Sequence, residues 1–187
     1  MPNTNRGRLA LKENVEYVLR DANGKVKKLF NPNRLGAAIF STFGVMPKLP
    51  IFGSFRDSLT ISNLVVNAGL AGMASRANGA GGEAAFTYIA LGIGTTAAAA
   101  GDTTLESEIT TAGGERASAT ASRVTTTVSN DTAQLLNTFN FTGSFSVTES
   151  GVLNAASGGT LLARQVFAAI SVSSGDSLQI TWKFDFS

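Results

Sequence analysis

The last nine residues before the terminal serine alternate strictly between apolar and polar side chains. The apolar positions are Leu178, Ile180, Trp182, Phe184 and Phe186. Successive side chains of a strand point to opposite faces, so this period of two predicts a strand with one buried face. At about 1.5–3 kcal/mol for each large apolar side chain buried, we expect this face to contribute greatly to the core.

Several shorter segments from residue 84 onward also have the composition or the alternation of strands, and turns rich in Gly, Ser and Asn separate them. The expected strands cover residues 86–91, 115–128, 133–142, 145–153 and 160–170. Regularly spaced strands without intervening helices predict a mainly β fold, an antiparallel, jelly-roll-like sandwich.

The front of the chain predicts an arm, a hairpin and a first helix. Met1 to Arg8 are polar and basic, and residues 1–12 read as an extended arm. Residues 15–20 and 25–30 flank Asn23-Gly24, a pair that favours the turn of a β-hairpin. Asn31-Pro32 predicts the start of a helix, with Asn as its cap and Pro at its first position.

A second helix is expected between Asn67 as cap and Asn78-Gly79 as stop. The stretch 45–58 reads as a linker lying against something apolar, and Asp102 is expected to cap a short helix over 102–106. The chain therefore divides into residues 1–60 (basic arm, hairpin and linker) and 61–187 (β-sandwich domain with a leading helix).

Composition narrows the function classes. The chain has 187 residues, of which 43% are hydrophobic and only 15% charged, whereas globular chains carry about 25% charged residues. A surface so poor in charge is more often covered by neighbouring subunits than left in water. We therefore expect a homo-oligomer.

The chain contains no cysteine and no histidine. Thiolate and histidine catalysis and the commonest metal ligands are thereby removed, and we expect no enzyme, cofactor or metal. Carboxylate or lysine chemistry stays possible. The polar, basic N-terminus is not a secretory signal, and no apolar run spans a bilayer, so we expect synthesis in a cytoplasm and no membrane partner.

Charge is distributed unevenly. Residues 1–60 hold ten Lys/Arg and four Asp/Glu, whereas residues 61–187 hold five and nine. This asymmetry favours docking of a positive arm on the acidic face of another subunit. Nucleic acid is the less favoured partner, because no continuous basic run interleaved with aromatics is present. The candidate docking residues are Arg6, Arg8, Lys12, Lys25, Lys27 and Lys28.

Three other motifs have simple structural interpretations. The Gly92-Ile93-Gly94 turn lacks the rest of a phosphate-binding loop, so a tight turn after a strand is expected. Asp102, Glu106 and Glu108 lack calcium-loop spacing, which favours a cap and a solvated face over a cation site. Glu149 and Arg164 are expected to form a cross-strand ion pair rather than a catalytic group.

Short phrases of the chain resemble proteins of tailed-phage virions. NAGL (67–70), IALGIGTT (89–96) and DTTL (102–105) look like a phrase of such proteins. TESGVLN (148–154), followed by GTLLAR (159–164), resembles the E-x-G-L-F-N … G-x-L-I-A-R pattern of phage tail-collar-fibre-like and related particle-surface modules. The resemblance covers roughly residues 60–187, and it implies a structural protein without catalytic residues.

The expected function is that of a repeated virion subunit, made in the host cytoplasm, which packs on major capsid or tail proteins. Many weak contacts in a symmetric particle give high total avidity. Capsid decoration or cement is slightly favoured. The alternatives are a neck, tail or fibre component, and a glycan- or receptor-binding module.

Overall fold

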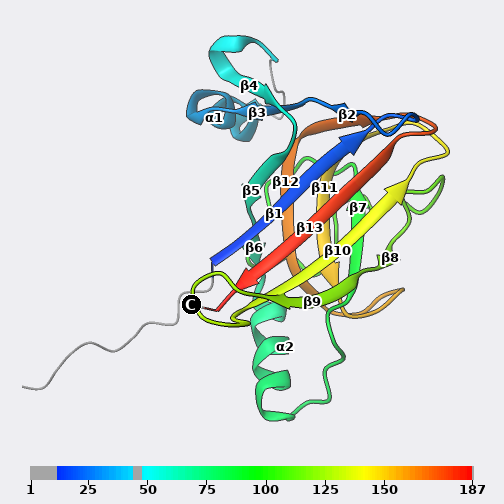
Figure 1. Ribbon diagram of the computed structural model, residues 1–187. Coiled ribbons are helices and arrows are strands. Elements are labelled where there is room, and N and C mark those ends of the chain that lie inside the picture. The colour runs from blue at the N-terminus through cyan, green and yellow to red at the C-terminus, as the bar shows by residue number, and fades with distance from the viewer. Residues whose placement is uncertain (1–11, 44–47, 187) are drawn as a thin grey trace, which may run out of the picture.

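The computed structural model describes residues 12–43 and 48–186. The fold is mainly β, as expected, with two antiparallel sheets packed face to face and two helices (Figure 1). The predicted arm, with Arg6 and Arg8, lies outside the described residues.

The first sheet is built around the C-terminal strand. Its order is β2 (Val26–Lys27), β1 (Lys12–Arg20), β13 (Ser177–Asp185), β10 (Thr132–Asn140) and β9 (Thr120–Val124), and β5 (Leu59–Ser62) also pairs with β1. β13 pairs over its whole length with β1 on one side and β10 on the other. This central place explains its alternation: Leu178, Ile180, Trp182 and Phe184 are at most 2% exposed. Phe186 was expected on the same buried face but follows the strand and is 40% exposed.

The second sheet faces the first. Its order is β6 (Leu64–Val65), β12 (Leu161–Val172), β11 (Phe145–Leu153), β7 (Tyr88–Gly92) and β8 (Ala117–Ser118). The predicted strand over 115–128 is two short strands, β8 and β9, one in each sheet, because the chain crosses from one sheet to the other there. The strand expected over 86–91 begins only at Tyr88.

The core lies between the two sheets. Inward side chains of both sheets form one cluster, in which the Tyr17 ring centroid of β1 lies 4.4 Å from that of Phe167 in β12. The Tyr17 hydroxyl is 2.7 Å from the Ser150 hydroxyl of β11, a buried hydrogen bond. This hydrogen bond links β1 of the first sheet to β11 of the second across the core.

The hairpin at the front of the chain is part of the sandwich. β1 and β2 pair around a turn whose Gly24 has φ of 78°, as the Asn-Gly signal predicted, but the strand expected over 25–30 is divided: β2 covers only Val26–Lys27, and residues 29–30 belong to β3. β1 also pairs along its nine residues with β13, so residues 12–20 are a central strand of the sheet rather than an appendage of it. The division expected at residue 60 therefore crosses continuous β structure.

A small module projects from one end of the sandwich (Figure 1). It consists of β3 (Leu29–Pro32), α1 (Arg34–Phe43), the 3₁₀ helix η1 (Pro50–Phe52) and β4 (Gly53–Arg56), and β3 pairs with β4. The sequence interpretation was wrong on two points here. The segment taken as a linker contains η1 and β4, and the helix begins after Asn33, not at Asn31-Pro32, which belong to β3.

Asn33 holds the module together. Its Oδ1 accepts a hydrogen bond from the Gly36 N–H at 3.0 Å, which caps α1, and its Nδ2 donates to the Ile51 carbonyl at 2.8 Å. A Cβ on Gly36 would collide with the Phe52 carbonyl. Asparagine and glycine therefore let α1 pack closely on η1.

The second helix, α2 (Asn67–Asn78), packs against β12 and ends at Gly79, whose φ is 73°. The predicted stop is confirmed because glycine adopts this left-handed conformation at little cost. The predicted cap is wrong: the cap position is Val66, which makes no side-chain capping bond. The short helix expected over 102–106 is also absent, since this part of the described chain is a loop.

Candidate functional site

The projecting module exposes apolar side chains. Its exposed large side chains are Leu35 (55%), Leu49 (55%), Ile51 (66%) and Phe55 (52%). We call the surface of residues 29–43 and 48–56 the tip. Four large apolar groups gathered on one small module differ from scattered surface apolar residues, which need no explanation. The tip is therefore a candidate contact surface for another protein.

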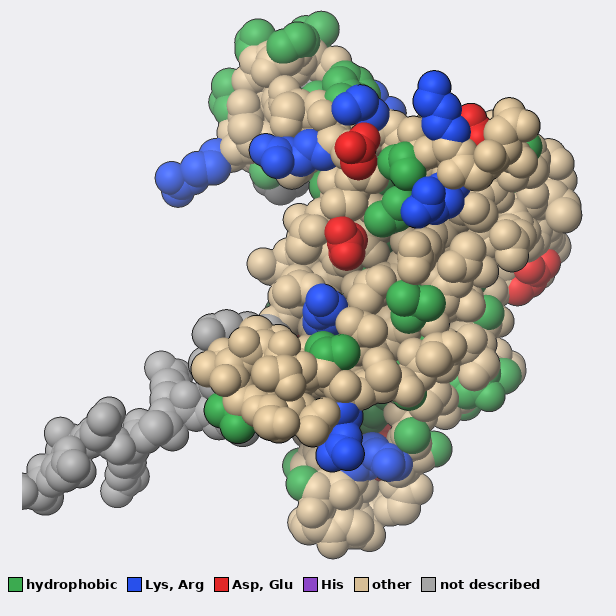
Figure 2. All heavy atoms as spheres, viewed as in Figure 1, with side chains coloured by type: hydrophobic (Ala, Val, Ile, Leu, Met, Phe, Trp, Pro, Cys, Tyr) green, Lys and Arg blue, Asp and Glu red, His purple; other side chains and the backbone are tan. Residues whose placement is uncertain are grey.

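The tip is also basic. From Ala22 to Arg56 the sequence has six Lys/Arg and no Asp/Glu. Arg34, Lys48 and Arg56 are exposed on the tip, and Figure 2 shows blue and green side chains together on this lobe. Apolar groups with a basic rim suit a partner surface that is apolar at its centre and acidic around it.

The residues predicted to dock are not gathered at one place. Lys27 Nζ lies 2.8 Å from Asp176 Oδ2, whose side chain is 7% exposed, so this lysine is engaged within the chain. Lys28 Nζ lies 3.5 Å from Asp57 in an exposed pair, and Lys25 is exposed in the hairpin turn. The backbone of Lys12 pairs with Asp185 at the start of β1. Lys25 and Lys28 are exposed, and the Lys27 side chain is 40% exposed beside Asp176.

A buried ion pair joins Glu149 in β11 to Arg164 in β12. Glu149 is fully buried, and its Oε2 lies 2.8 Å from Arg164 Nε. The expected ion pair is thus confirmed, although the register is diagonal: Arg164 stands opposite Gly151, and Glu149 opposite Val166.

Glu149 accepts more hydrogen bonds from a loop. Its Oε1 accepts from the Gly94 and Ser107 N–H groups at 3.0 and 2.7 Å, and its Oε2 accepts from the Glu106 N–H at 3.1 Å. One carboxylate therefore fixes both ends of the loop over residues 94–107. Burial of such a charge is tolerable because its oxygens have charged and backbone donors.

Arg164 extends the cluster to two more carboxylates. Its Nη1 lies 2.8 Å from Asp102 Oδ2, and its Nη2 lies 3.5 Å from Glu106 Oε2. Burial acts to raise the pKa of Asp102, but the Ala99 N–H and Arg164 outweigh it, so that this pKa lies below its usual value. The Thr96 N–H and hydroxyl lower the pKa of Glu106. Of the three acidic residues expected on a solvated helix face, Asp102 and Glu106 instead contact Arg164, and Glu108 pairs with Arg116, whose Nη2 lies 2.6 Å from Glu108 Oε2.

Two glycines, Gly92 at the end of β7 and Gly94 just after it, make this arrangement possible. A Cβ on Gly92 or Gly94 would collide with the Glu149 carboxylate. The tight turn expected at Gly92-Ile93-Gly94 is not formed: Gly92 ends β7, and the chain continues beside residues 107–109, where the Ile93 N–H donates to the Ser107 carbonyl at 2.9 Å. The two glycines are required by the close approach of the Glu149 side chain rather than by a phosphate.

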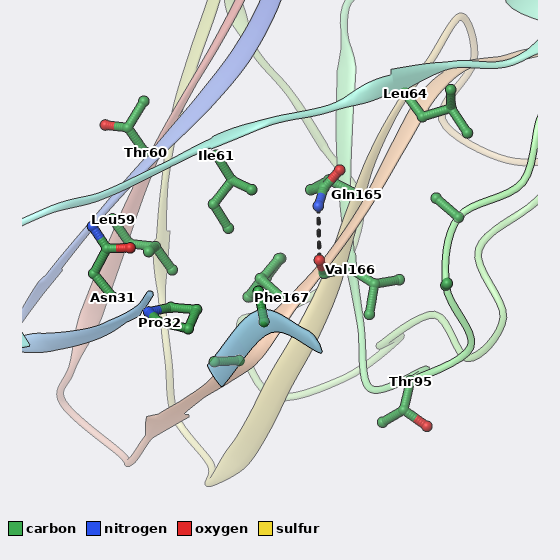
Figure 3. A pocket seen from close by; sticks show the side chains of 14 residues that line it. Asn31, Pro32, Leu59, Thr60, Ile61, Leu64, Thr95, Gln165, Val166 and Phe167 are labelled. Atoms are coloured by element: carbon green, nitrogen blue, oxygen red, sulfur yellow. Dashed lines mark hydrogen bonds between the residues drawn. The ribbon is translucent and has the colours of Figure 1, made fainter. Parts of the chain in front are cut away.

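A pocket of about 440 Å³ opens beside β12 (Figure 3). Its walls come from β5, β6, the tip and the loop after β7, and they include Leu59, Ile61, Leu64, Val166 and Phe167. None of its lining residues is charged. Within it, the Gln165 Nε2 donates to the Val166 carbonyl at 2.8 Å, as the dashed line in Figure 3 marks.

Comparisons with known proteins give no relative: no family model matches the chain, and neither a curated protein nor a solved structure matches it significantly. Among the described residues, no group of three or more acidic side chains is arranged to hold a metal ion. No described helix is long and apolar enough to cross a membrane.

Sequence reasoning missed the tip and the pocket. The Pro- and Phe-rich stretch 45–58 was the available signal for the tip. The prediction that this stretch lies against something apolar indicated a contact, but it did not predict the secondary structure that forms the tip. The pocket has no sequence signal, since its walls come from four separated parts of the chain.

Proposed function

We propose that this protein is a structural subunit of a tailed-phage virion which packs on other particle proteins through its tip. The observation that carries the proposal is the exposed cluster of Leu35, Leu49, Ile51 and Phe55 with its basic rim. The resemblance of residues 60–187 to phage particle-surface modules supports the particle assignment.

The partner surface is acidic around an apolar centre. Burying one large side chain contributes about 1.5–3 kcal/mol, so several tip residues suffice for a specific contact when many copies bind together. The charges add orientation and a dependence on ionic strength. Decoration of the capsid is favoured over a place in the neck, tail or fibre.

The test is binding of the purified protein to particles assembled without it, followed by co-sedimentation. Ile51→Ser and Phe55→Ser are each expected to weaken binding about tenfold. Val128→Ser is the matched control, because Val128 is 63% exposed but lies outside the tip. Tip variants that bind like the wild type, or a wild-type protein that binds no particle, would overturn the proposal.

Copy number distinguishes the two places in the particle. Hundreds of copies per virion would support capsid decoration, whereas a handful would move the proposal to the neck, tail or fibre. Quantitative mass spectrometry of purified virions against the major capsid protein measures this number.

A further inference from the structure

A second pocket, of about 460 Å³, lies between α2 and the first sheet, at the end of the sandwich where β13 ends and β10 begins (Figure 1). We call it the helix pocket. Core side chains form its inner wall: Leu135, Leu162 and Phe184 line it and are at most 5% exposed. This size and this mainly apolar lining are typical of pockets that bind small molecules.

The helix pocket is open because short side chains surround its inner wall. Four of the lining residues are alanines from separate parts of the fold: Ala77 of α2, Ala85 before β7, Ala121 of β9 and Ala133 of β10. A single larger side chain at one of these positions would occupy the space. The pocket therefore follows from where the sequence places alanine.

Two arginines lie at the mouth of the helix pocket. Arg76 of α2 lines it, and one guanidinium nitrogen, Nη1, donates to the Glu83 carbonyl at 2.9 Å. Arg123 of β9 is two residues from Ala121 and shares its strand face, so it flanks the pocket. Both arginines are exposed, and within the described residues neither forms an ion pair. Figure 2 shows basic and hydrophobic side chains together where α2 meets the sheet.

Neighbouring carboxylates do not neutralise this charge. The Glu83 carboxylate accepts a hydrogen bond from Asn154 Nδ2. Glu13 lies beside Phe184 on the β1 side and accepts a hydrogen bond from the Val65 backbone. Neither lines the pocket, and Arg76 is the only charged residue among the described ones that do. The mouth therefore favours an anionic group.

The walls of the helix pocket suit an alkyl chain better than a peptide. β10 and β13 are each paired with a strand on both sides, and the backbone of α2 bonds within the helix, so these walls offer few free backbone groups. A peptide would bury N–H and C=O groups there without partners, whereas an alkyl chain has none to satisfy. Of the polar side chains in the wall, Ser122 and Gln134 already bind each other, at 3.4 Å.

We propose that the helix pocket binds a medium-chain fatty acid. The alkyl chain packs on Leu135, Leu162 and Phe184, and the carboxylate accepts charge-assisted hydrogen bonds from Arg76 and Arg123. The site lies at the opposite end of the sandwich from the tip (Figure 1), and the inference is independent of the particle assignment.

The single tryptophan of the chain reports on this site. Trp182 stacks on Phe184 with ring centroids 6.0 Å apart, and Phe184 lines the helix pocket. Bromine quenches tryptophan fluorescence at close range. Undecanoate carrying a terminal bromine, kept below its micellar concentration, is therefore expected to quench Trp182 saturably in the full chain. Unlabelled undecanoate should compete, and undecylammonium, of opposite charge, should compete at least about tenfold more weakly.

Two substitutions with matched controls locate the binding. Ala77→Phe, at an exposed position of α2, fills the pocket from outside and is expected to weaken binding about tenfold or more. Ala74→Phe, exposed on the same helix but not lining the pocket, should bind like the wild type. Arg76→Gln/Arg123→Gln is expected to weaken undecanoate binding about tenfold and to leave competition by uncharged undecanol unchanged. Arg34→Gln, on the tip, is its control.

A wild type without saturable quenching would overturn the proposal, and so would equal affinities of Ala77→Phe and the wild type. Light scattering of the same samples tests the other occupant, a second copy of the chain. A wild-type oligomer that binds no undecanoate and that Ala77→Phe dissociates would assign the pocket to an interface between copies, which also overturns the proposal.

Discussion

Glu149 and Arg164 are both almost completely buried, and Glu149 Oε2 lies 2.8 Å from Arg164 Nε. Each of the two side chains also binds the loop over residues 94–107. Replacing Glu149 by Gln keeps the shape of the side chain and removes its charge. The substitution leaves the buried Arg164 without its charged partner at position 149. It also directs the amide N–H of Gln toward backbone N–H groups, which cannot accept a hydrogen bond. Breaking a buried pair costs about 3–5 kcal/mol, so we expect Glu149→Gln to lower the free energy of unfolding by that order.

Urea unfolding followed by circular dichroism measures this loss. Glu115→Gln is the control, because Glu115 is exposed, and its unfolding midpoint should stay close to that of the wild type. Equal midpoints for Glu149→Gln and the wild type would contradict the role given to the pair.

Gly94→Ala tests the close approach of the loop to Glu149. A Cβ at this position would collide with the carboxylate, so the loop or the side chain must move. We expect a loss of about 1–3 kcal/mol, the usual cost of overpacking. Gly101→Ala is the matched control, since a Cβ there meets no atom within 4 Å. A thermal shift assay compares the two, and similar shifts would argue against a steric requirement at Gly94.

Tyr17→Phe tests the hydrogen bond between the sheets. Burial raises the pKa of Tyr17, and its hydroxyl has Ser150 as a buried partner. Removing the hydroxyl leaves Ser150 unsatisfied, at about 1–2 kcal/mol. Adding Ser150→Ala should recover part of this loss, because both partners are then gone. Tyr88→Phe, at a half-buried tyrosine, serves as the control in chemical denaturation.

The hydrogen bonds of Asp131 predict that the stability of the fold decreases at acidic pH. Hydrogen bonds from the N–H groups of Val128, Thr126 and Thr127 hold the pKa of Asp131 well below its usual range. A folded-state pKa below the unfolded one stabilises the fold above the unfolded value, about 3.9, and this contribution is lost as the pH falls through the folded value.

We therefore expect the unfolding midpoint to fall between neutral pH and about pH 3, and to fall less in Asp131→Asn, which is already weakened at neutral pH. Asp57→Asn, at an exposed residue, should keep the acid dependence of the wild type. An Asp131→Asn protein with unchanged acid dependence would assign the effect to other carboxylates.

Asn33→Ala tests whether the tip is held as a unit. The substitution removes the cap of α1 and the bond to the Ile51 carbonyl, at about 0.5–2 kcal/mol. We expect faster amide exchange in residues 34–43 and 48–56 and unchanged protection in β13, because the tip projects from the sandwich and these two hydrogen bonds lie within it. Asn23→Ala, in the hairpin turn, should leave exchange in the tip unchanged.

The sequence by itself determined the elements whose signals are local. The alternation of β13, the Asn-Gly hairpin and the end of α2 at Gly79 follow from side-chain period and backbone preference, and each is present where it was predicted. The pair of Glu149 and Arg164 could also be predicted, because a hairpin joins their strands.

Only the tertiary structure decided how distant segments meet. Asp102 and Glu106 bind an arginine about sixty residues away, and this contact holds a loop where local capping signals favoured a helix. The same holds for the tip, where pairing of β3 with β4 overrode a linker-like composition. It also holds for the pocket, which forms where the chain passes from β5 in one sheet to β6 in the other and where β12 bulges. Such features depend on packing between segments far apart in the chain, and no local pattern of residues encodes which segments those are.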